Sequence, residues 1–200
     1  MTEVKGTSSD DNLYGTAQTD LIEAYEGNNN LFGRRSNDFL DGGEGKDILY
    51  GYAGNDTLVG GASDDLLNGA GLAYKDSTGS QNFGNEDVDT LTGGSGRDTF
   101  QLWGGSGRSG IDAYYNGTGD RDYALISDFD LSEDIIQLTN IEGASSIVSP
   151  VYYSLGASSD GLSTALYVSN RGKKPDLIAV LQDVSVESLS FGGNYFSFAN

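Results

Sequence analysis

Residues 42–59 read Gly-Gly-Glu-Gly-Lys-Asp-Ile-Leu-Tyr and then Gly-Tyr-Ala-Gly-Asn-Asp-Thr-Leu-Val, two units of nine residues placed end to end. Glycine opens each unit and returns at its fourth position, Asp stands at the sixth position, and Leu at the eighth. Glycine tolerates positive φ and close backbone approach, so the first six residues are expected to turn. The last three form a short strand whose middle residue points away from its two neighbours.

The frame of nine continues on both sides without a gap, so that seven units cover residues 6–68. The eighth position is a large aliphatic residue in every unit, namely Leu13, Ile22, Leu31, Leu40, Leu49, Leu58 and Leu67. The sixth position holds Asp11, Asp20, Asn29, Asp38, Asp47, Asp56 and Asp65. The fourth position is weaker, because only Gly27, Gly45 and Gly54 fit it. A chance frame would not keep an aliphatic residue at every eighth position.

The units match Gly-Gly-x-Gly-x-Asp-x-U-x, where U is a large apolar residue, and therefore resemble the calcium-binding nonapeptide of the RTX (repeats-in-toxin, hemolysin-type) family. The resemblance implies an all-β fold, a right-handed parallel β-roll in which two units make one coil. The U residues would form a stacked core between two parallel sheets, and no coil would be stable without its neighbours.

The resemblance also implies that several Ca²⁺ ions lie between turns of successive coils, with partners 18 residues apart. Carboxylates from the sixth position and main-chain carbonyls of the turns would supply the oxygen ligands that calcium prefers. The expected carboxylate ligands are Asp11, Asp20, Asp38, Asp47, Asp56, Asp65, Asp89 and Asp98. The expected carbonyl donors include Gly42, Gly45, Gly51, Gly54, Gly93 and Gly96. Pairs that use Asn29 lose one charge and should bind calcium less well.

Residues 70–83 do not fit the frame, which resumes at Gly84 and gives a further clean unit at residues 93–101. One interpretation is an expanded turn, with an insertion of 15 residues, that pairs Asp56 with Asp89 and Asp65 with Asp98. The alternative is a break between two short rolls. We adopt the first, and predict a roll over residues 6–101 with an inserted loop at about 70–83.

Residues 102–200 lack the nonapeptide and are predicted to form a β-rich C-terminal region that caps the open end of the roll. Strand-like runs cover residues 123–129, 134–138, 147–155, 162–169, 176–182 and 195–198, with no convincing helix. Residues 176–182 are apolar on both faces, which predicts a central strand. The run Asp128, Asp130, Ser132 and Asp134 resembles the start of an EF-hand, but Glu133 stands where the loop needs Gly. A different calcium site, or a charge cluster at a strand end, stays open there.

The composition excludes several classes of function. Acids outnumber bases by 30 to 11, giving a net charge of −19, which argues against binding to nucleic acid or an anionic membrane. The chain has no Cys and no His, so thiolate sites, imidazole bases and histidine-containing triads are ruled out. No 18-residue apolar run exists that could span a membrane, and the N-terminus lacks the apolar region of a signal peptide. The resemblance instead implies a bacterial protein secreted to the extracellular space by type I secretion machinery.

Tyr14, Phe32 and Tyr50 occupy the ninth position of alternate units, and should form a stripe with one ring per coil, about 4.8 Å apart. Such a stripe either lies beneath the C-terminal half, which we favour, or is exposed and binds a glycan. The sequence therefore predicts a calcium-binding structural or secretion module that is not an enzyme. The alternative is a calcium-dependent module that binds an extracellular polysaccharide, resembling the roll modules of alginate epimerases.

Overall fold

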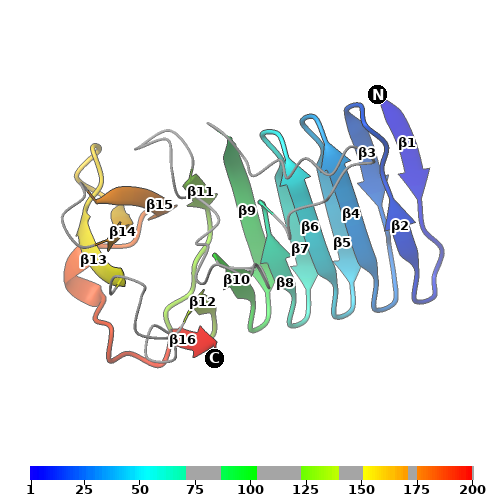
Figure 1. The fold of residues 1–200 in the computed structure, drawn as a ribbon. Coiled ribbons are helices and arrows are strands. Elements are labelled where there is room, and N and C mark those ends of the chain that lie inside the picture. The colour runs from blue at the N-terminus through cyan, green and yellow to red at the C-terminus, as the bar shows by residue number, and fades with distance from the viewer. Residues whose placement is uncertain (71–86, 103–122, 140–150, 171–174, 200) are drawn as a thin grey trace.

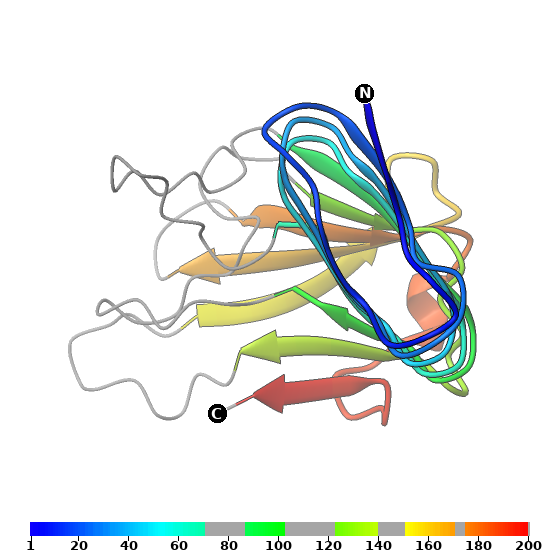
Figure 2. The ribbon, with the colours of Figure 1, turned by 90° about the vertical axis from the view of Figure 1, so that its right-hand side faces the viewer.

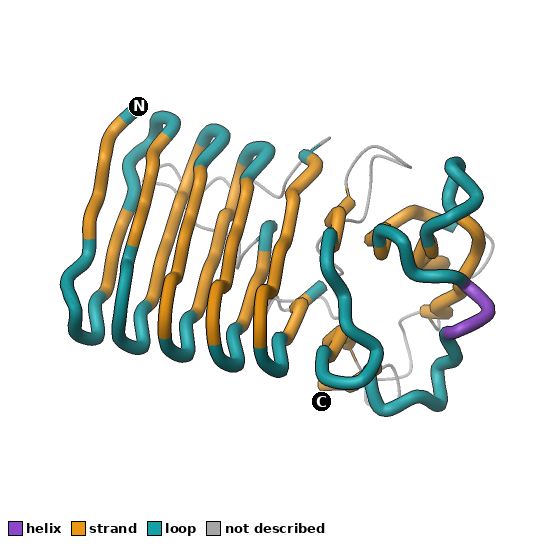
Figure 3. The backbone as a smooth tube through the Cα atoms, turned by 180° about the vertical axis from the view of Figure 1, so that it is seen from behind, coloured by secondary structure: helices purple, strands orange, loops and turns teal. Residues whose placement is uncertain are grey.

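The computed structural model describes residues 1–70, 87–102, 123–139, 151–170 and 175–199 of the 200-residue chain. Within these ranges the protein is almost entirely β-structure, arranged as two sheets that face each other (Figures 1 and 3). This confirms the all-β class and the parallel β-roll that the repeat predicts.

The strands alternate between the two sheets along the chain. The first sheet contains, in spatial order, β1 (Thr2–Lys5), β3 (Asp20–Glu23), β5 (Phe39–Glu44), β7 (Thr57–Ala62), β9 (Val88–Ser95), β11 (Tyr123–Ile126), β15 (Asp176–Leu181), β14 (Thr164–Asn170) and β13 (Val151–Ala157). The second contains β16 (Phe196–Ala199), β12 (Ile135–Thr139), β10 (Thr99–Gln101), β8 (Leu66–Asn68), β6 (Ile48–Ala53), β4 (Asn30–Arg35) and β2 (Asn12–Tyr14). A short 3₁₀ turn, η1 (Val186–Ser188), follows β15.

The core of the roll is a pair of ladders in which each apolar eighth residue sits directly beside the next one in its sheet. In the second sheet the pairing runs through Leu13, Leu31, Leu49, Leu67, Phe100 and Ile136. In the first sheet it runs through Ile22, Leu40, Leu58, Leu91, Ile126 and Leu181. All except Leu13 at the open N-terminal end are completely buried. The inward direction of these residues is what the strand alternation predicts.

Viewed along its axis, the roll shows successive coils laid over one another (Figure 2). Parallel pairing also crosses the interruption of the repeat, because Leu58 on β7 pairs with Leu91 on β9 and Leu67 on β8 pairs with Phe100 on β10. Residues 71–86 themselves lie outside the described residues. One roll therefore runs from β1 to β10 with both ladders continuous.

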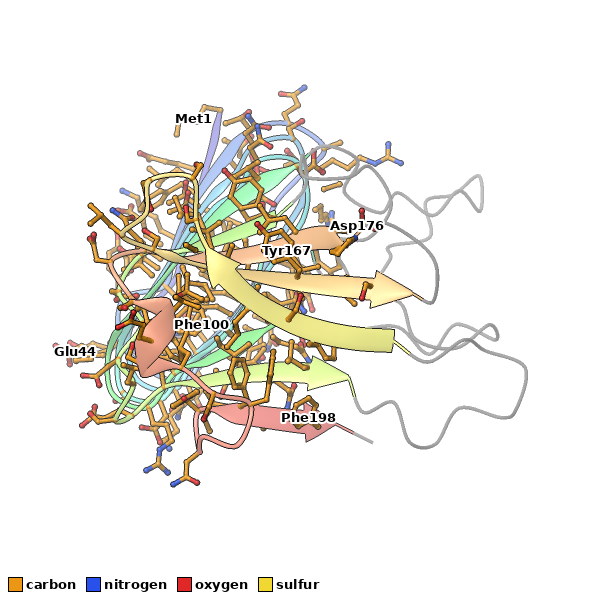
Figure 4. All side chains as sticks on the ribbon, turned by 90° about the vertical axis from the view of Figure 1, so that its left-hand side faces the viewer. Met1, Glu44, Phe100, Tyr167, Asp176 and Phe198 are labelled. Carbon is orange, nitrogen blue, oxygen red and sulfur yellow. The ribbon has the colours of Figure 1, made fainter. Side chains whose placement is uncertain are left out.

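The C-terminal half extends both sheets of the roll along its axis. β11 pairs in parallel with β9, and β12 pairs in parallel with β10. Beyond them, β15, β14 and β13 continue the first sheet with two antiparallel pairings, and β16 flanks β12 in the second. β15 is a central strand between β11 and β14, as its apolar faces predict. The core is one cluster, in which Phe100 lies between the sheets (Figure 4). The domain boundary at residues 101/102 stays a prediction.

The turns hold several non-glycine residues at positive φ. Tyr25, Arg34 and Tyr52 replace glycine at the second position of their units, with φ of 74°, 89° and 79°. Ser36 and Ser63 replace it at the fourth position, with φ of 71° and 91°. A side chain with a Cβ pays about 1–2 kcal/mol for this conformation, so the roll carries local strain where the repeat lacks its glycine.

Replacing Ser63 by glycine should therefore stabilise the roll. Ser63 is exposed, and relief of strain outweighs the added entropy of the unfolded chain, leaving a gain of about 0.5–1 kcal/mol. Chemical unfolding in saturating calcium would measure it. The matched control is Ala62→Gly, one residue earlier in β7, where φ is not positive and glycine should destabilise. A loss of stability in Ser63→Gly would contradict the strain argument.

Candidate metal centre

The side chains at the sixth position of each unit form two rows, one along each turn edge of the roll. In each row, the Oδ1 atom of one residue accepts a hydrogen bond from the backbone N–H of the equivalent residue one coil earlier. One row contains Asp11, Asn29, Asp47, Asp65, Asp98 and Asp134, joined by bonds of 2.7–3.0 Å. The other contains Asp20, Asp38, Asp56 and Asp89, joined by bonds of 2.8 Å. The structure thus brings together the pairs that the spacing of 18 residues predicts, including the two across the interruption.

Five of these carboxylates are buried with one oxygen left over. The Oδ2 atoms of Asp38, Asp47, Asp56, Asp65 and Asp98 have no hydrogen-bond partner, and the five side chains are at most 3% exposed. A buried carboxylate oxygen without a partner is strongly destabilising, because it loses its water and gains nothing in return. These five atoms are the strongest indication of a cation site in the described part of the chain.

The glycine at the first position explains how each carboxylate reaches this place. A Cβ on Gly33 would lie 2.6 Å from Asp38 Oδ2, and one on Gly60 would lie 2.5 Å from Asp65 Oδ2. Gly42, Gly51 and Gly93 stand in the same relation to Asp47, Asp56 and Asp98. Any larger residue would therefore fill the space into which Oδ2 points. At the fourth position, Gly45, Gly54 and Gly96 adopt φ of 117°, 126° and 129°, which favours glycine.

Burial makes these carboxylates hold their protons tightly when no cation is present. It raises the pKa of Asp38 to about 7, and that of Asp98 to about 6, from an ordinary value of 3.8. Burial, with the neighbouring carboxylates second, raises the pKa of Asp56 to about 9 and that of Asp65 to about 8. Burial also raises the pKa of Asp47. In each case the ionised form lacks a compensating positive charge.

The first two turns of the roll differ, because their carboxylates have protein donors. Asp11 Oδ2 accepts hydrogen bonds from the backbone N–H and the hydroxyl of Thr7, at 2.6 and 2.9 Å. Asp20 Oδ2 accepts the same two bonds from Thr16, at 2.5 and 3.0 Å. Burial alone would raise the pKa of Asp20, but the bonds from Thr16 and Thr2 outweigh it and lower that pKa. These two predicted ligands therefore lie in the rows with their Oδ2 atoms already hydrogen-bonded.

In the third turn, the side chain of Asn29 makes hydrogen bonds through both its oxygen and its nitrogen. Its Oδ1 accepts the bond from Asp11, as the aspartates do, while its Nδ2 donates to the carbonyls of Glu26 and Gly27, at 3.3 and 3.1 Å. These carbonyls occupy the third and fourth positions of the same unit. An amide nitrogen thus lies where an aspartate would place a second oxygen.

Sequence reasoning missed the role of Asp134, which extends one row into the C-terminal half. Its Oδ1 accepts from the N–H of Asp98 at 3.0 Å, and its Oδ2 accepts from the N–H of Asp130 at 2.8 Å. Asp128 accepts from the N–H groups of Gly93 and Gly94, at 2.9 and 2.8 Å. The spacing Asp134-x-Ile136, equal to the Asp-x-U of the repeat, is the signal that could have revealed it. Within this acidic run, Asp128 and Asp134 accept hydrogen bonds from backbone N–H groups at the end of the roll, and the run forms no EF-hand.

The described residues contain no cluster of three or more acidic side chains that could hold a metal by themselves. A cation at these turns would therefore need main-chain carbonyls for most of its shell, which suits calcium, since it accepts backbone oxygens. The residues present fit that ion, because five turns each offer an unpaired carboxylate oxygen and the turns also contain main-chain carbonyl groups.

The aromatic stripe lies on the outer face of the second sheet. The rings of Tyr14 and Phe32 stack with centroids 4.8 Å apart and an interplanar angle of 11°, and those of Phe32 and Tyr50 with 5.8 Å and 5°. Tyr14 is 52% exposed, whereas Phe32 and Tyr50 are half-buried. The described strands of the C-terminal half lie beyond the end of the roll and not over this face (Figure 1).

A comparison with known protein families identifies the same nonapeptide repeat. Residues 5–40, 41–71 and 83–108 match the family described as RTX calcium-binding nonapeptide repeat. These segments therefore match RTX calcium-binding repeats, and Ca²⁺ is the ion that repeats of this family bind. No curated protein matches the chain closely enough to count as a relative. Among its described residues, no helix is long and apolar enough to cross a membrane.

Solved structures that align with the chain include two subunits of the Azotobacter vinelandii mannuronan C5-epimerase. The AlgE6R3 subunit is 24% identical, with 97% of this chain and 81% of that chain covered, at a TM-score of 0.33. The AlgE6R2 subunit is 22% identical, with 100% and 94% covered, at a TM-score of 0.31. The family assignment rests on the repeat motif and the strand register.

Without calcium, the folded chain should lose stability as the pH rises from about 4 to about 9. Below about pH 4 the carboxyls are protonated in both states, and no penalty arises. Above it the unfolded chain releases protons that folded Asp98, Asp38, Asp65 and Asp56 still hold, until their pKa values of about 6 to 9 are passed.

Urea unfolding of metal-stripped protein at about pH 5 and about pH 8 would test this expectation. The denaturant midpoint should be lower at the higher pH, and added calcium should reverse the order, because ionised carboxylates bind it. A midpoint in stripped protein that stays constant or rises with pH would contradict the account of buried acids. The depressed pKa values of Asp130 and Asp160 act below this pH window.

Proposed function

We propose that this chain is a secreted structural or secretion module whose roll folds when several Ca²⁺ ions bind between its turns. The observation that carries the proposal is the set of five buried Oδ2 atoms, on Asp38, Asp47, Asp56, Asp65 and Asp98, that no protein group satisfies. They lie inside the family-matched repeats and nowhere else among the described residues.

The proposed ions would be held by these five carboxylates together with carbonyl groups of the turns, among them those of Gly42, Gly45, Gly51, Gly54, Gly93 and Gly96. Bound calcium would supply positive charge to a chain whose net charge is −19 and whose folded state otherwise stacks acids in rows. Magnesium fits poorly, since it demands a small octahedral shell and keeps its waters.

Folding and metal binding would then be one event. An unfolded chain has no preformed turn, so the free energy of binding appears as free energy of folding. Such a module stays unfolded where calcium is scarce and folds where calcium is abundant, which suits export from a cell before folding. Type I secretion is the route that the family resemblance suggests.

The alternative function, polysaccharide binding at the aromatic stripe, is weakened by the ring geometry. Phe32 has Tyr14 stacked on one face and Tyr50 on the other, so neither of its faces is open to a sugar ring. Stacked pairs of this kind contribute about 0.5–1.5 kcal/mol beyond their buried area. We infer that the stripe holds successive coils together on the outside, as the leucine ladder does on the inside.

At about pH 8, where the stripped chain is least stable, calcium should convert it from mainly disordered to β-structured in a cooperative transition, and magnesium should not. Far-UV circular dichroism during titration of each ion measures the change. A stripped chain that already shows its full β signal would contradict metal-coupled folding.

A matched pair of variants tests the placement of the ions. Asp65→Ala should lower the number of bound calcium ions by one, whereas Asp64→Ala, its exposed neighbour paired with Lys46, should leave the number unchanged. Equilibrium dialysis against labelled calcium gives the count. Equal counts for the two variants would show that the buried row is not the binding site.

Tyr14→Ala should lower the stability of the calcium-loaded roll by about 1 kcal/mol, because it removes one stacked ring pair. It should leave the mobility of the chain unchanged in gels that contain neutral or acidic polysaccharide. Retardation of the wild-type chain by one of these polymers, abolished by Tyr14→Ala, would instead establish the glycan-binding alternative.

A further inference from the structure

We propose that the side-chain amide of Asn29 takes the place of a calcium ion in its turn, so that the N-terminal three turns are closed by protein hydrogen bonds and the calcium-dependent roll begins at residue 33. The inference rests on the proposed function, since it divides the turns into those that bind calcium and those that need none.

The first step is that Asn29 and the aspartates hold the same orientation. Asn29 Oδ1 accepts from the N–H of Asp11 at 2.8 Å, and Asp47 Oδ1 accepts from the N–H of Asn29 at 2.7 Å. The same bond recurs between Asp47 and Asp65. Because Oδ1 has one role throughout, the Nδ2 atom of Asn29 corresponds to the Oδ2 atom of each aspartate in its row.

The groups around Asn29 Nδ2 are acceptors. Asn29 Nδ2 donates to the carbonyls of Glu26 and Gly27 in its own unit. In the unit of Asp47 the equivalent carbonyls belong to Glu44 and Gly45, the side chain ends in an oxygen, and Oδ2 has no partner. Two acceptors cannot bond to each other, so a carboxylate oxygen at this position needs a cation or a proton, whereas an amide N–H bonds to the carbonyls directly.

The third step is that the two turns before Asn29 are also closed from within. Thr7 and Thr16 donate both a backbone N–H and a hydroxyl to the carboxylates of Asp11 and Asp20. Three consecutive turns, two with Thr and one with Asn, therefore leave no Asp Oδ2 or Asn amide group unsatisfied. The five unsatisfied oxygens all lie in later units.

A physical reason for this arrangement lies in the end of the roll. The first turn of each row, which holds Asp11 or Asp20, has a neighbouring turn on one side only, so a cation there would lack carbonyls from a preceding turn. Terminal repeats of a stacked array commonly depart from the consensus for this reason. Here the departure consists of hydrogen bonds that replace the ion.

Two reciprocal variants test the proposal, and each should change the calcium count and the metal-free stability in opposite directions. Asn29→Asp should bind one calcium ion more than the wild-type chain, and its urea midpoint in metal-stripped protein, measured at about pH 5 where the stripped chain is more stable, should fall. Asp47→Asn should bind one ion fewer, and its metal-stripped midpoint should rise, because an amide then joins the carbonyls that a carboxylate cannot. Native mass spectrometry in calcium counts the ions.

The matched control is Asn30→Asp, which adds the same charge one residue away, where the side chain donates to Asn12 on the outer face. Its calcium count should equal that of the wild-type chain. If the wild-type chain binds several calcium ions and Asn29→Asp binds the same number, this inference is overturned and the proposed function stands. A metal-stripped midpoint that falls in Asp47→Asn would overturn it as well. A wild-type chain that binds no calcium would overturn both.

Discussion

Stacked, buried carboxylates are the constraint on which the rest of this structure depends. Each coil places an acid above the acid of the previous coil, and a backbone N–H satisfies only one of its two oxygens. Hydrophobic burial in the leucine ladders favours the stack, but the remaining oxygens oppose it. A folded roll is stable only if each such oxygen finds a cation, a proton or a donor. The fold and the proposed metal requirement thus have a single cause.

The molecule meets this constraint differently along its length. Threonine donors close the first two turns, an asparagine amide closes the third, and the last turn in the row of Asp98 is closed by the backbone around Asp130 and Asp134. Only the middle of the roll keeps unsatisfied oxygens. The unsatisfied oxygens are therefore concentrated in the units from residue 33 onward, and the proposed metal requirement with them.

The C-terminal half matters to the roll because it continues both sheets and the core. β11 and β12 add to the two sheets at the same register as the preceding strands, and Ile126 and Ile136 extend the two apolar ladders. The edge that an isolated roll would expose is in this way covered by further strands, which removes a template for aggregation. The antiparallel strands β13 and β14 then end the parallel arrangement of the first sheet.

The sequence by itself determined the repeat, the inward Leu and Ile residues, the alternation between two sheets and the rows of Asp 18 residues apart. These follow from local periodicity, because side-chain direction alternates along a strand and glycine marks each turn. Only the tertiary structure decided which carboxylates are satisfied, since this depends on Thr7, Thr16 and the orientation of the Asn29 amide. It also decided that Asp134 joins a row across 36 residues and that Phe32 has both faces covered. These features arise from contacts between distant residues, and only for Asp134 does a local pattern, Asp134-x-Ile136, point to the contact.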